Sequence, residues 1–159
     1  MNSNRIGTDK LVIGTLSPIF KNESYKEVLE ILDFLYGLGI KRIDTSPTYG
    51  NGNVQRLLGR EEINLDRFEV TSKVFADVTG SGKEGLNSRN LDQSVDFTLS
   101  SLNMDCLDRL LLHEYDKNVS LTNLASNLNE LQEKGKVKKI GFCKWPFDKA
   151  KNLIQLLTY

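Results

Sequence analysis

Residues 41–52 read KRIDTSPTYGNG, a short strand-like run that ends at Asp44 and leads into a glycine-rich turn carrying Tyr49. Two later strand-like runs also end on a polar residue, FEVTSK at Lys73 and LDRLLLH at His113. In a parallel α/β sheet the carboxyl ends of the strands form the functional edge. We therefore expect an acid, a lysine, a histidine and a tyrosine at one edge, where they can move a proton and stabilise charge.

The alternation of side chains along these strands predicts that the end residues share one face of the sheet. Successive side chains in a strand point to opposite faces. Lys73 has the same parity as Thr71, and His113 has the same parity as Leu111. If the apolar faces of the strands pack on helices, then Asp44, Lys73 and His113 all lie on the opposite, inner side.

Strand-like and helix-like runs alternate along the whole chain. We expect strands at 11–14, 41–44, 68–73, 107–113 and 138–142. Apolar residues at helical spacing predict helices within 25–35, 53–58, 95–102, 121–131 and 150–157. The polar, glycine-rich residues 77–87 are predicted to form a loop. The expected helix caps are Ser24 or Asn22, Ser88 or Asn90, and Ser120, with Pro146 in the first turn of the last helix.

This alternation makes five βα units, which indicates a parallel sheet joined by right-handed crossovers. Two α/β architectures fit, a doubly wound open sheet and part of an eight-stranded barrel. A chain of 159 residues is too short for a whole barrel, which typically needs about 250. Residues 1–159 are expected to form one domain around a single core.

Composition limits the partners and the setting. The 21 lysines and arginines balance the 21 aspartates and glutamates, so the formal net charge is zero. This balance argues against nucleic acid or an anionic membrane as the main partner, and it favours association. No apolar run is long enough to span a bilayer, and no signal region follows Met1. Cys106 and Cys143 are too few and too scattered for a disulfide framework or a zinc site, so we expect no metal and a cytoplasmic location.

Four segments together resemble the aldo-keto reductase family. Residues 44–50 resemble its Asp-Thr-Ala motif with the Tyr-Gly that follows, and 71–74 resemble its catalytic-lysine strand. Residues 110–113 resemble its catalytic-histidine strand, and 134–141 resemble the entry to its fifth strand. Each segment alone is a weak signal, but four in the family's order are specific. The resemblance implies a partial TIM (β/α)8 barrel of about five βα units, the N-terminal part of that fold.

What the resemblance implies is the NAD(P)H-dependent reduction of an aldehyde or ketone, with a small carbonyl compound as substrate. The family's catalytic tetrad maps to Asp44, Tyr49, Lys73 and His113. Tyr49 would act as the general acid, and the ammonium group of Lys73 would stabilise its phenolate. Asp44 would pair with Lys73, and His113 would hydrogen-bond the carbonyl oxygen of the substrate.

The cofactor that the resemblance implies is NADP(H), at positions Thr15, Asp44, Cys143 and Lys144. In the family a Ser-Asn pair holds the nicotinamide carboxamide, and here Cys143 and Lys144 take those places. Cysteine is a poor hydrogen-bond donor, and lysine offers no acceptor. The family's remaining cofactor contacts come mostly from strands six to eight. We therefore expect the isolated chain to be weak or inactive.

Two other readings of the same residues stay open. The chain can be a truncated, non-catalytic half-barrel that works through a partner, since its two open sheet edges can also support self-association. Alternatively, Lys73 can act as the nucleophile of a Schiff-base lyase. The turn between Asp44 and Tyr49 fits the reductase better than the lyase.

Overall fold

The computed structural model describes residues 7–22, 24–76 and 84–158, and part of the predicted loop 77–87 lies outside them. One parallel sheet organises the chain, and its strands follow one another in the order β1-β2-β3-β4-β5. The strands are β1 (Ile13–Gly14), β2 (Arg42–Asp44), β3 (Glu69–Val74), β4 (Leu107–Leu112) and β5 (Val137–Phe142). A doubly wound sheet reverses its strand order. The consecutive order seen here is that of part of a (β/α)8 barrel, as expected.

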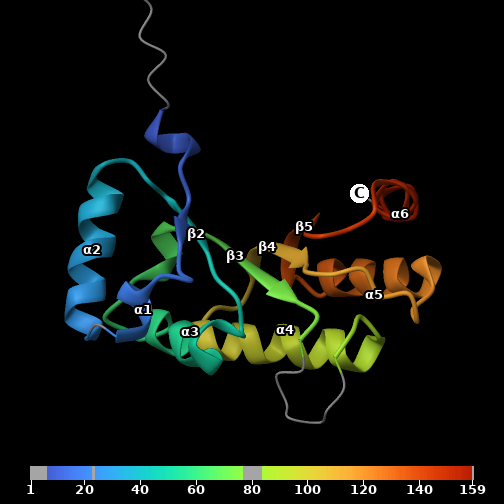
Figure 1. Ribbon diagram of the computed structural model, residues 1–159, viewed down its shortest axis with the longest axis horizontal. Coiled ribbons are helices and arrows are strands. Elements are labelled where there is room, and N and C mark those ends of the chain that lie inside the picture. The colour runs from blue at the N-terminus through green and yellow to red at the C-terminus, as the bar shows by residue number, and fades with distance from the viewer. Residues whose placement is uncertain (1–6, 23, 77–83, 159) are drawn as a thin grey trace, which may run out of the picture.

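The described residues form six α-helices, five of them between consecutive strands and α6 after β5, and these helices cover one face of the sheet (Figure 1). They are α1 (Pro18–Asn22), α2 (Tyr25–Gly37), α3 (Asn53–Leu58), α4 (Ser88–Leu102), α5 (Leu121–Glu133) and α6 (Phe147–Ile154). Three short 3-10 helices lie at η1 (Thr8–Lys10), η2 (Tyr49–Gly52) and η3 (Leu65–Arg67). Consecutive order with right-handed crossovers puts the helices on the same side of the sheet, so no helix of the described residues covers the inner face. None of the described helices is long and apolar enough to span a bilayer.

The helix caps are where local sequence was most informative. Ser24 begins α2 with a capping box, in which its hydroxyl accepts from the backbone N–H of Glu27. Ser120 caps α5 in the same way through the backbone N–H of Asn123. The predicted cap of α4 was wrong, since Asn87 rather than Ser88 or Asn90 takes that role.

Several predicted boundaries also shift. The first strand begins at Ile13 rather than at Leu11, and the short helix η1 ends just before Leu11, which is its C-cap. Lys73 is followed by Val74 within β3, and His113 lies one residue beyond β4. Pro146 precedes α6 as its N-cap instead of standing in its first turn. The helix α1 was not predicted.

The hydrophobic core lies between the sheet and the helices. Its strand residues have the parity opposite to Lys73 and include Ile43, Val70, Leu110 and Leu112, all at most 1% exposed. Helices α2, α4 and α5 each contribute several buried residues at helical spacing, as predicted. The strand residues that alternate with these core residues, Lys73 among them, therefore face the inner side of the sheet.

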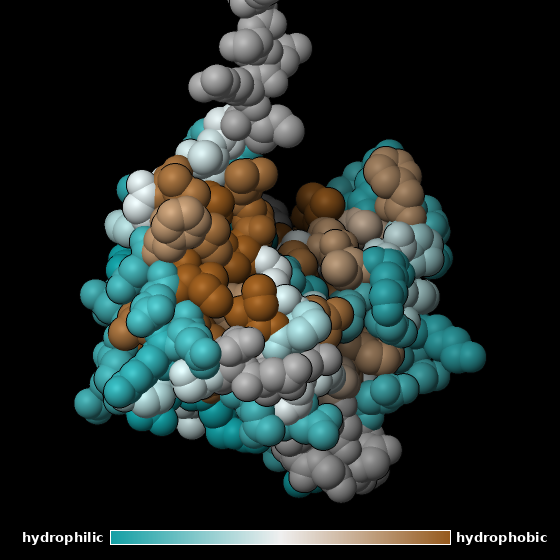
Figure 2. Space-filling model, turned by 60° about the vertical axis from the view of Figure 1, so that its left-hand side comes forward, coloured by the Kyte–Doolittle hydropathy of each residue, from teal (hydrophilic) through white to brown (hydrophobic). Residues whose placement is uncertain are grey.

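The inner face is open and partly polar. Figure 2 shows a hollow beside the hydrophobic side chains that gather at the N-terminal side of the molecule. The large hydrophobic residues exposed on and near β1 are Leu11, Val12, Leu16 and Ile19. On the inner face itself Arg109 pairs with Glu69 at 2.5 Å and donates to the Thr71 hydroxyl. Arg109 pairs in register with Thr71, which precedes Lys73 by two residues on the same face of β3.

Candidate active site

Lys73 is the centre of the site. It stands on β3 with only 6% of the residue exposed, and its ammonium group donates to three oxygen atoms. One is the carboxylate of Asp44, one the backbone carbonyl of Thr45 at 3.0 Å, and one the hydroxyl of Tyr49 at 3.1 Å. The predicted hydrogen bond between Tyr49 and Lys73 is confirmed, as is the predicted common face of Asp44 and Lys73.

Strand register explains why Asp44 and Lys73 meet. Asp44 pairs with Thr71 between β2 and β3, so Lys73 stands two residues further along the same face. The charged pair is only partly open to solvent, with the Asp44 side chain 29% exposed and the Lys73 side chain 7% exposed. A partly buried ammonium needs such acceptors to offset its lost hydration.

Tyr49 reaches Lys73 because the chain turns back on itself immediately after β2. Gly50 and Asn51 adopt left-handed conformations, with φ of 56° and 54°, and Gly52 follows at 82°. Glycine tolerates this region without steric cost, and asparagine is among the residues that best adopt it. The turn places Tyr49 beside the end of β3, where Lys73 Nζ lies 5.0 Å from the centroid of the tyrosine ring.

His113 closes the site on the side of β4. Its backbone N–H donates to the carbonyl of Val74 at 2.9 Å, which continues the ladder between β3 and β4. Burial of the imidazole lowers the pKa of His113 below its ordinary value, and the positive charges of Lys144 and Lys73 lower it further. His113 is therefore a neutral imidazole at neutral pH, with one N–H to donate and one nitrogen to accept.

The residues expected at the cofactor positions are placed differently from one another. Thr15 is fully buried, and its hydroxyl donates to the backbone carbonyl of Asp44 at 3.1 Å. Cys143 is half-buried and its backbone N–H donates to Leu112. Lys144 has a left-handed backbone, with φ of 52°, and its Nζ donates to Glu114 Oε1 at 2.7 Å. Their roles in binding a cofactor stay predictions.

Sequence reasoning missed two features around His113. Glu114 pairs with Lys144 from the next strand end, and no local pattern signals that pairing. The rings of Tyr115 and Phe142 pack against Trp145 with centroids 5.2 Å away in each case. This aromatic cluster joins the segment after β4 to the end of β5 and the segment after it.

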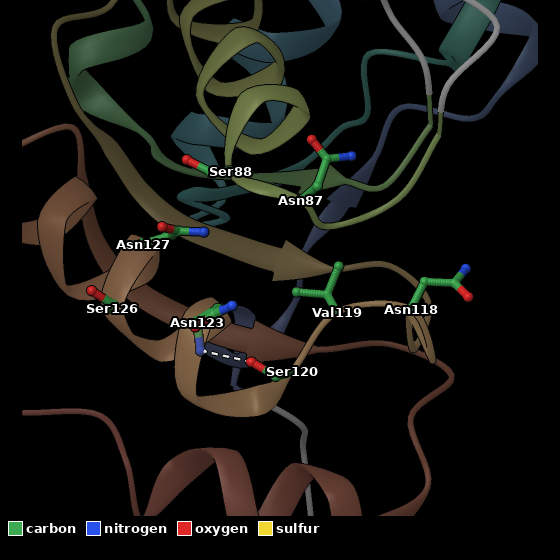
Figure 3. Close-up of a pocket in the computed structure, with 8 residues that line it drawn as sticks. All are labelled: Asn87, Ser88, Asn118, Val119, Ser120, Asn123, Ser126 and Asn127. Atoms are coloured by element: carbon green, nitrogen blue, oxygen red, sulfur yellow. Dashed lines mark hydrogen bonds between the residues drawn. The ribbon is translucent and has the colours of Figure 1, made fainter.

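A polar pocket of about 380 Å³ lies outside this site, between the N-terminal turns of α4 and α5 (Figure 3). Its lining residues are Asn87, Ser88, Asn118, Val119, Ser120, Asn123, Ser126 and Asn127. None of them belongs to the group around Lys73. No cluster of histidine, cysteine and acidic residues among the described residues is arranged to hold a metal ion.

The arrangement around Lys73 suits proton transfer to an oxygen atom that gains negative charge. A phenol hydroxyl stands next to a fixed ammonium group, which stabilises the phenolate left after the proton departs. A neutral imidazole at the next strand end can donate a second hydrogen bond to the same oxygen.

Comparison with known proteins places this geometry in a family. A family model described as "Aldo/keto reductase family" matches residues 10–158. Norsolorinic acid reductase B of Aspergillus parasiticus is 30% identical over 138 residues, which cover 80% of this chain and 36% of that protein. An aryl-alcohol dehydrogenase of Pestalotiopsis microspora is 29% identical over 134 residues, covering 78% of this chain and 35% of that protein.

A solved structure has the same fold. A thermostable aldo-keto reductase crystallised with the inhibitor epalrestat superposes with a TM-score of 0.76 at 23% identity. The match covers 99% of this chain and 57% of that one. The chain thus spans less than two-fifths of these two curated relatives and somewhat over half of the solved structure.

Proposed function

The chain belongs to the aldo/keto reductase family, and on this basis we propose that it takes part in reducing the carbonyl group of an aldehyde or ketone, with Tyr49 as the proton donor. The observation that carries the proposal is the 3.1 Å hydrogen bond between the Tyr49 hydroxyl and Lys73 Nζ. Two relatives named as a reductase and an alcohol dehydrogenase support the same class of reaction.

The proton is supplied from Tyr49. When a hydride adds to the carbonyl carbon, the electron pair of the C=O bond moves to oxygen, and the Tyr49 hydroxyl gives that oxygen its proton. The resulting phenolate lies beside the Lys73 ammonium, which Asp44 and the Thr45 carbonyl hold in place. General acid catalysis of this kind contributes roughly 10²- to 10⁴-fold to the rate.

His113 orients the carbonyl oxygen in this proposal. Its lowered pKa keeps the imidazole neutral, so one ring nitrogen carries a proton that can be donated to the oxygen. In this proposal the imidazole N–H points at the place where negative charge develops, which is the condition for electrostatic stabilisation.

A nicotinamide nucleotide would supply the hydride when bound, but the residues at the carboxamide position fit it poorly. A carboxamide needs a donor for its oxygen and an acceptor for its NH₂ group. Lys144 Nζ carries only donors and is already bonded to Glu114, and the Cys143 thiol is a weak partner. We therefore propose NADP(H) as the cofactor with weak binding by this polypeptide.

Slow turnover and its dependence on Tyr49 test the proposal. The purified chain is incubated with NADPH and 4-nitrobenzaldehyde, and the alcohol product is quantified by chromatography. We expect very slow turnover that Tyr49→Phe abolishes and that Tyr36→Phe, a matched change on α2, leaves intact. Product formation that is unchanged in Tyr49→Phe would remove Tyr49 from the reaction.

The Schiff-base alternative is separated by trapping. A lysine nucleophile needs a free electron pair on its amine, whereas all three partners of Lys73 Nζ are acceptors, the arrangement that an ammonium group requires. Borohydride with an aldehyde should therefore leave Lys73 unmodified under conditions that label exposed lysines. A stable adduct on Lys73, found by mass spectrometry, would favour the lyase.

A further inference from the structure

We propose that Gln55 is a positioning residue, which fixes α3 on the outer face of β3 so that the Tyr49 hydroxyl meets Lys73 on the inner face. The Nε2 atom of Gln55 donates to the Ser72 hydroxyl at 2.8 Å. Ser72 and Lys73 are consecutive in β3, so their side chains point to opposite faces. The inference rests on the proposed role of Tyr49 as proton donor.

Two hydrogen bonds therefore link the same pair of segments from opposite sides of one strand. Tyr49 is bonded to Lys73 on the inner face, and Gln55, six residues later, is bonded to Ser72 on the outer face. The segment between them has left-handed residues at Gly50 and Gly52, so its path does not follow from helical geometry alone. The hydrogen bond from Gln55 to Ser72 attaches this segment to β3 at a second point and so restricts its path.

Burial argues that the amide serves orientation rather than stability. Gln55 and Ser72 are both 0% exposed. The other amide atom, Gln55 Oε1, is buried without a hydrogen-bond partner among the described residues. A buried polar atom without a partner costs stability, and apolar side chains of similar size in place of both Gln55 and Ser72 would avoid that cost. What the apolar side chains would lose is the directed bond between the two positions.

Arg56 provides a matched control in the same helix. Its guanidinium donates to the Asn51 carbonyl at 3.2 Å and to Asn53 Oδ1 at 2.9 Å, both within the same segment. These bonds shape the segment but do not attach it to β3. Loss of the Arg56 side chain should therefore leave the separation between Tyr49 and Lys73 unchanged.

The test follows Tyr49 directly, without requiring turnover. The protein is labelled with [¹³Cζ]tyrosine, and the Tyr49 resonance among the five tyrosines is assigned by its loss in Tyr49→Phe. We expect the double variant Gln55→Met with Ser72→Ala, which removes both buried partners, to move the Tyr49 resonance. The other tyrosine resonances should stay in place, and the melting temperature should hold or rise. Gln55→Glu, which can accept from the Ser72 hydroxyl, and Arg56→Met should both leave the Tyr49 resonance in place.

Two outcomes would overturn the inference. One is a folded double variant whose Tyr49 resonance is unmoved, and the other is a double variant that fails to fold, because the hydrogen-bonded pair would then serve stability. Where turnover is measurable, the double variant should lower kcat by roughly ten- to a hundredfold with KM unchanged, as expected for a misplaced catalytic group. Absence of turnover in the unmodified chain would count against the proposed function but leaves the resonance experiment decisive for Gln55.

Discussion

Lys144 and Glu114 form an ion pair at 2.7 Å that joins the chain after β5 to the chain after β4, beside His113. Both side chains are largely exposed, 64% for Lys144 and 45% for Glu114, so the pair contributes little to stability. Its effect is on the neighbouring imidazole, since Lys144 lowers the pKa of His113 and Glu114 raises it.

The first prediction concerns the protonation of His113. Lys144→Gln removes a nearby positive charge and leaves the charge of Glu114 unpaired, so the pKa of His113 should rise. Glu114→Gln removes a negative charge and should lower that pKa. Because the chain has one histidine, a single imidazole C–H resonance followed by NMR over pH reports the value. Equal pKa values of His113 in the two variants would contradict the opposite effects assigned to Lys144 and Glu114.

The same shift predicts how stability depends on pH. Between the ordinary histidine pKa of about 6.5 and its lower value in the folded protein, the unfolded chain binds the proton and the folded one does not. The contribution of His113 to the free energy of unfolding therefore falls as the pH drops through this window, and it is constant at higher pH. Lys144→Gln should narrow the window, which urea unfolding at a series of pH values would measure.

The second prediction concerns cofactor affinity. Replacing Cys143 and Lys144 by Ser and Asn restores donors and an acceptor at the expected carboxamide position, so NADPH should bind more tightly. Trp145, the sole tryptophan, lies next to these residues and provides the fluorescence signal for titration. Lys151→Asn on the exposed side of α6 is the control for the lost charge. Equal affinity in the double variant and the control would argue against this position for the cofactor.

The third prediction concerns packing at Gly59. A Cβ added there would lie 2.2 Å from the Ser101 carbonyl oxygen and 2.7 Å from the Leu102 carbonyl carbon, both of them backbone atoms that cannot move away freely. Gly59→Ala should therefore destabilise the fold by about 1–3 kcal/mol, the usual cost of overpacking. Thermal unfolding by circular dichroism would measure the change.

Gly37 is the matched control for that substitution. It ends α2, its backbone is not left-handed, and nothing lies within 4 Å of an added Cβ. Gly37→Ala should stabilise the protein by about 0.4–1 kcal/mol, because alanine loses less conformational entropy on folding. If the two variants have the same melting temperature, the end of α3 does not approach the end of α4 as closely as described above.

The fourth prediction concerns self-association of the polypeptide. Strands β1 and β5 each have one neighbour within the described sheet, and the residues beside β1 are apolar, with Val12 49% exposed and Leu16 60% exposed. Unpaired strand edges of this kind template pairing with another chain. We expect light scattering at tens of micromolar to show oligomers that Val12→Lys reduces.

The control for that edge is Phe34, which is more exposed at 67% but lies on α2, away from the strand edge. Phe34→Lys should reduce association less than Val12→Lys. If light scattering shows that the unmodified chain is a monomer, self-association is excluded. If both changes have equal effects, the association does not use the edge of β1.

Local sequence predicted most of the elements and the chemistry of the strand ends. Ser24 and Ser120 signalled two helix starts because capping depends on neighbours in the chain. The cap of α4 was misplaced by one residue from Ser88, although it too is local, since the Asn87 side chain accepts from the backbone N–H of Asn90. Asn90 Nδ2 donates to the carbonyl of Phe75, and Asp116 accepts from the backbone of Leu86, so the approach to α4 is held from outside the helix.

What the sequence by itself determined is the alternation of strands and helices, the polar residue at the end of each central strand, and their common parity. These follow from periodicities of two and 3.6 residues, which are local. Tertiary structure alone decided the bonds of Lys73 to Tyr49 and Asp44, the pairing of Lys144 with Glu114, and the anchoring of Gln55 on Ser72. Each of these contacts depends on strand register and on the path of a left-handed turn, and both are set by packing between segments far apart in the chain.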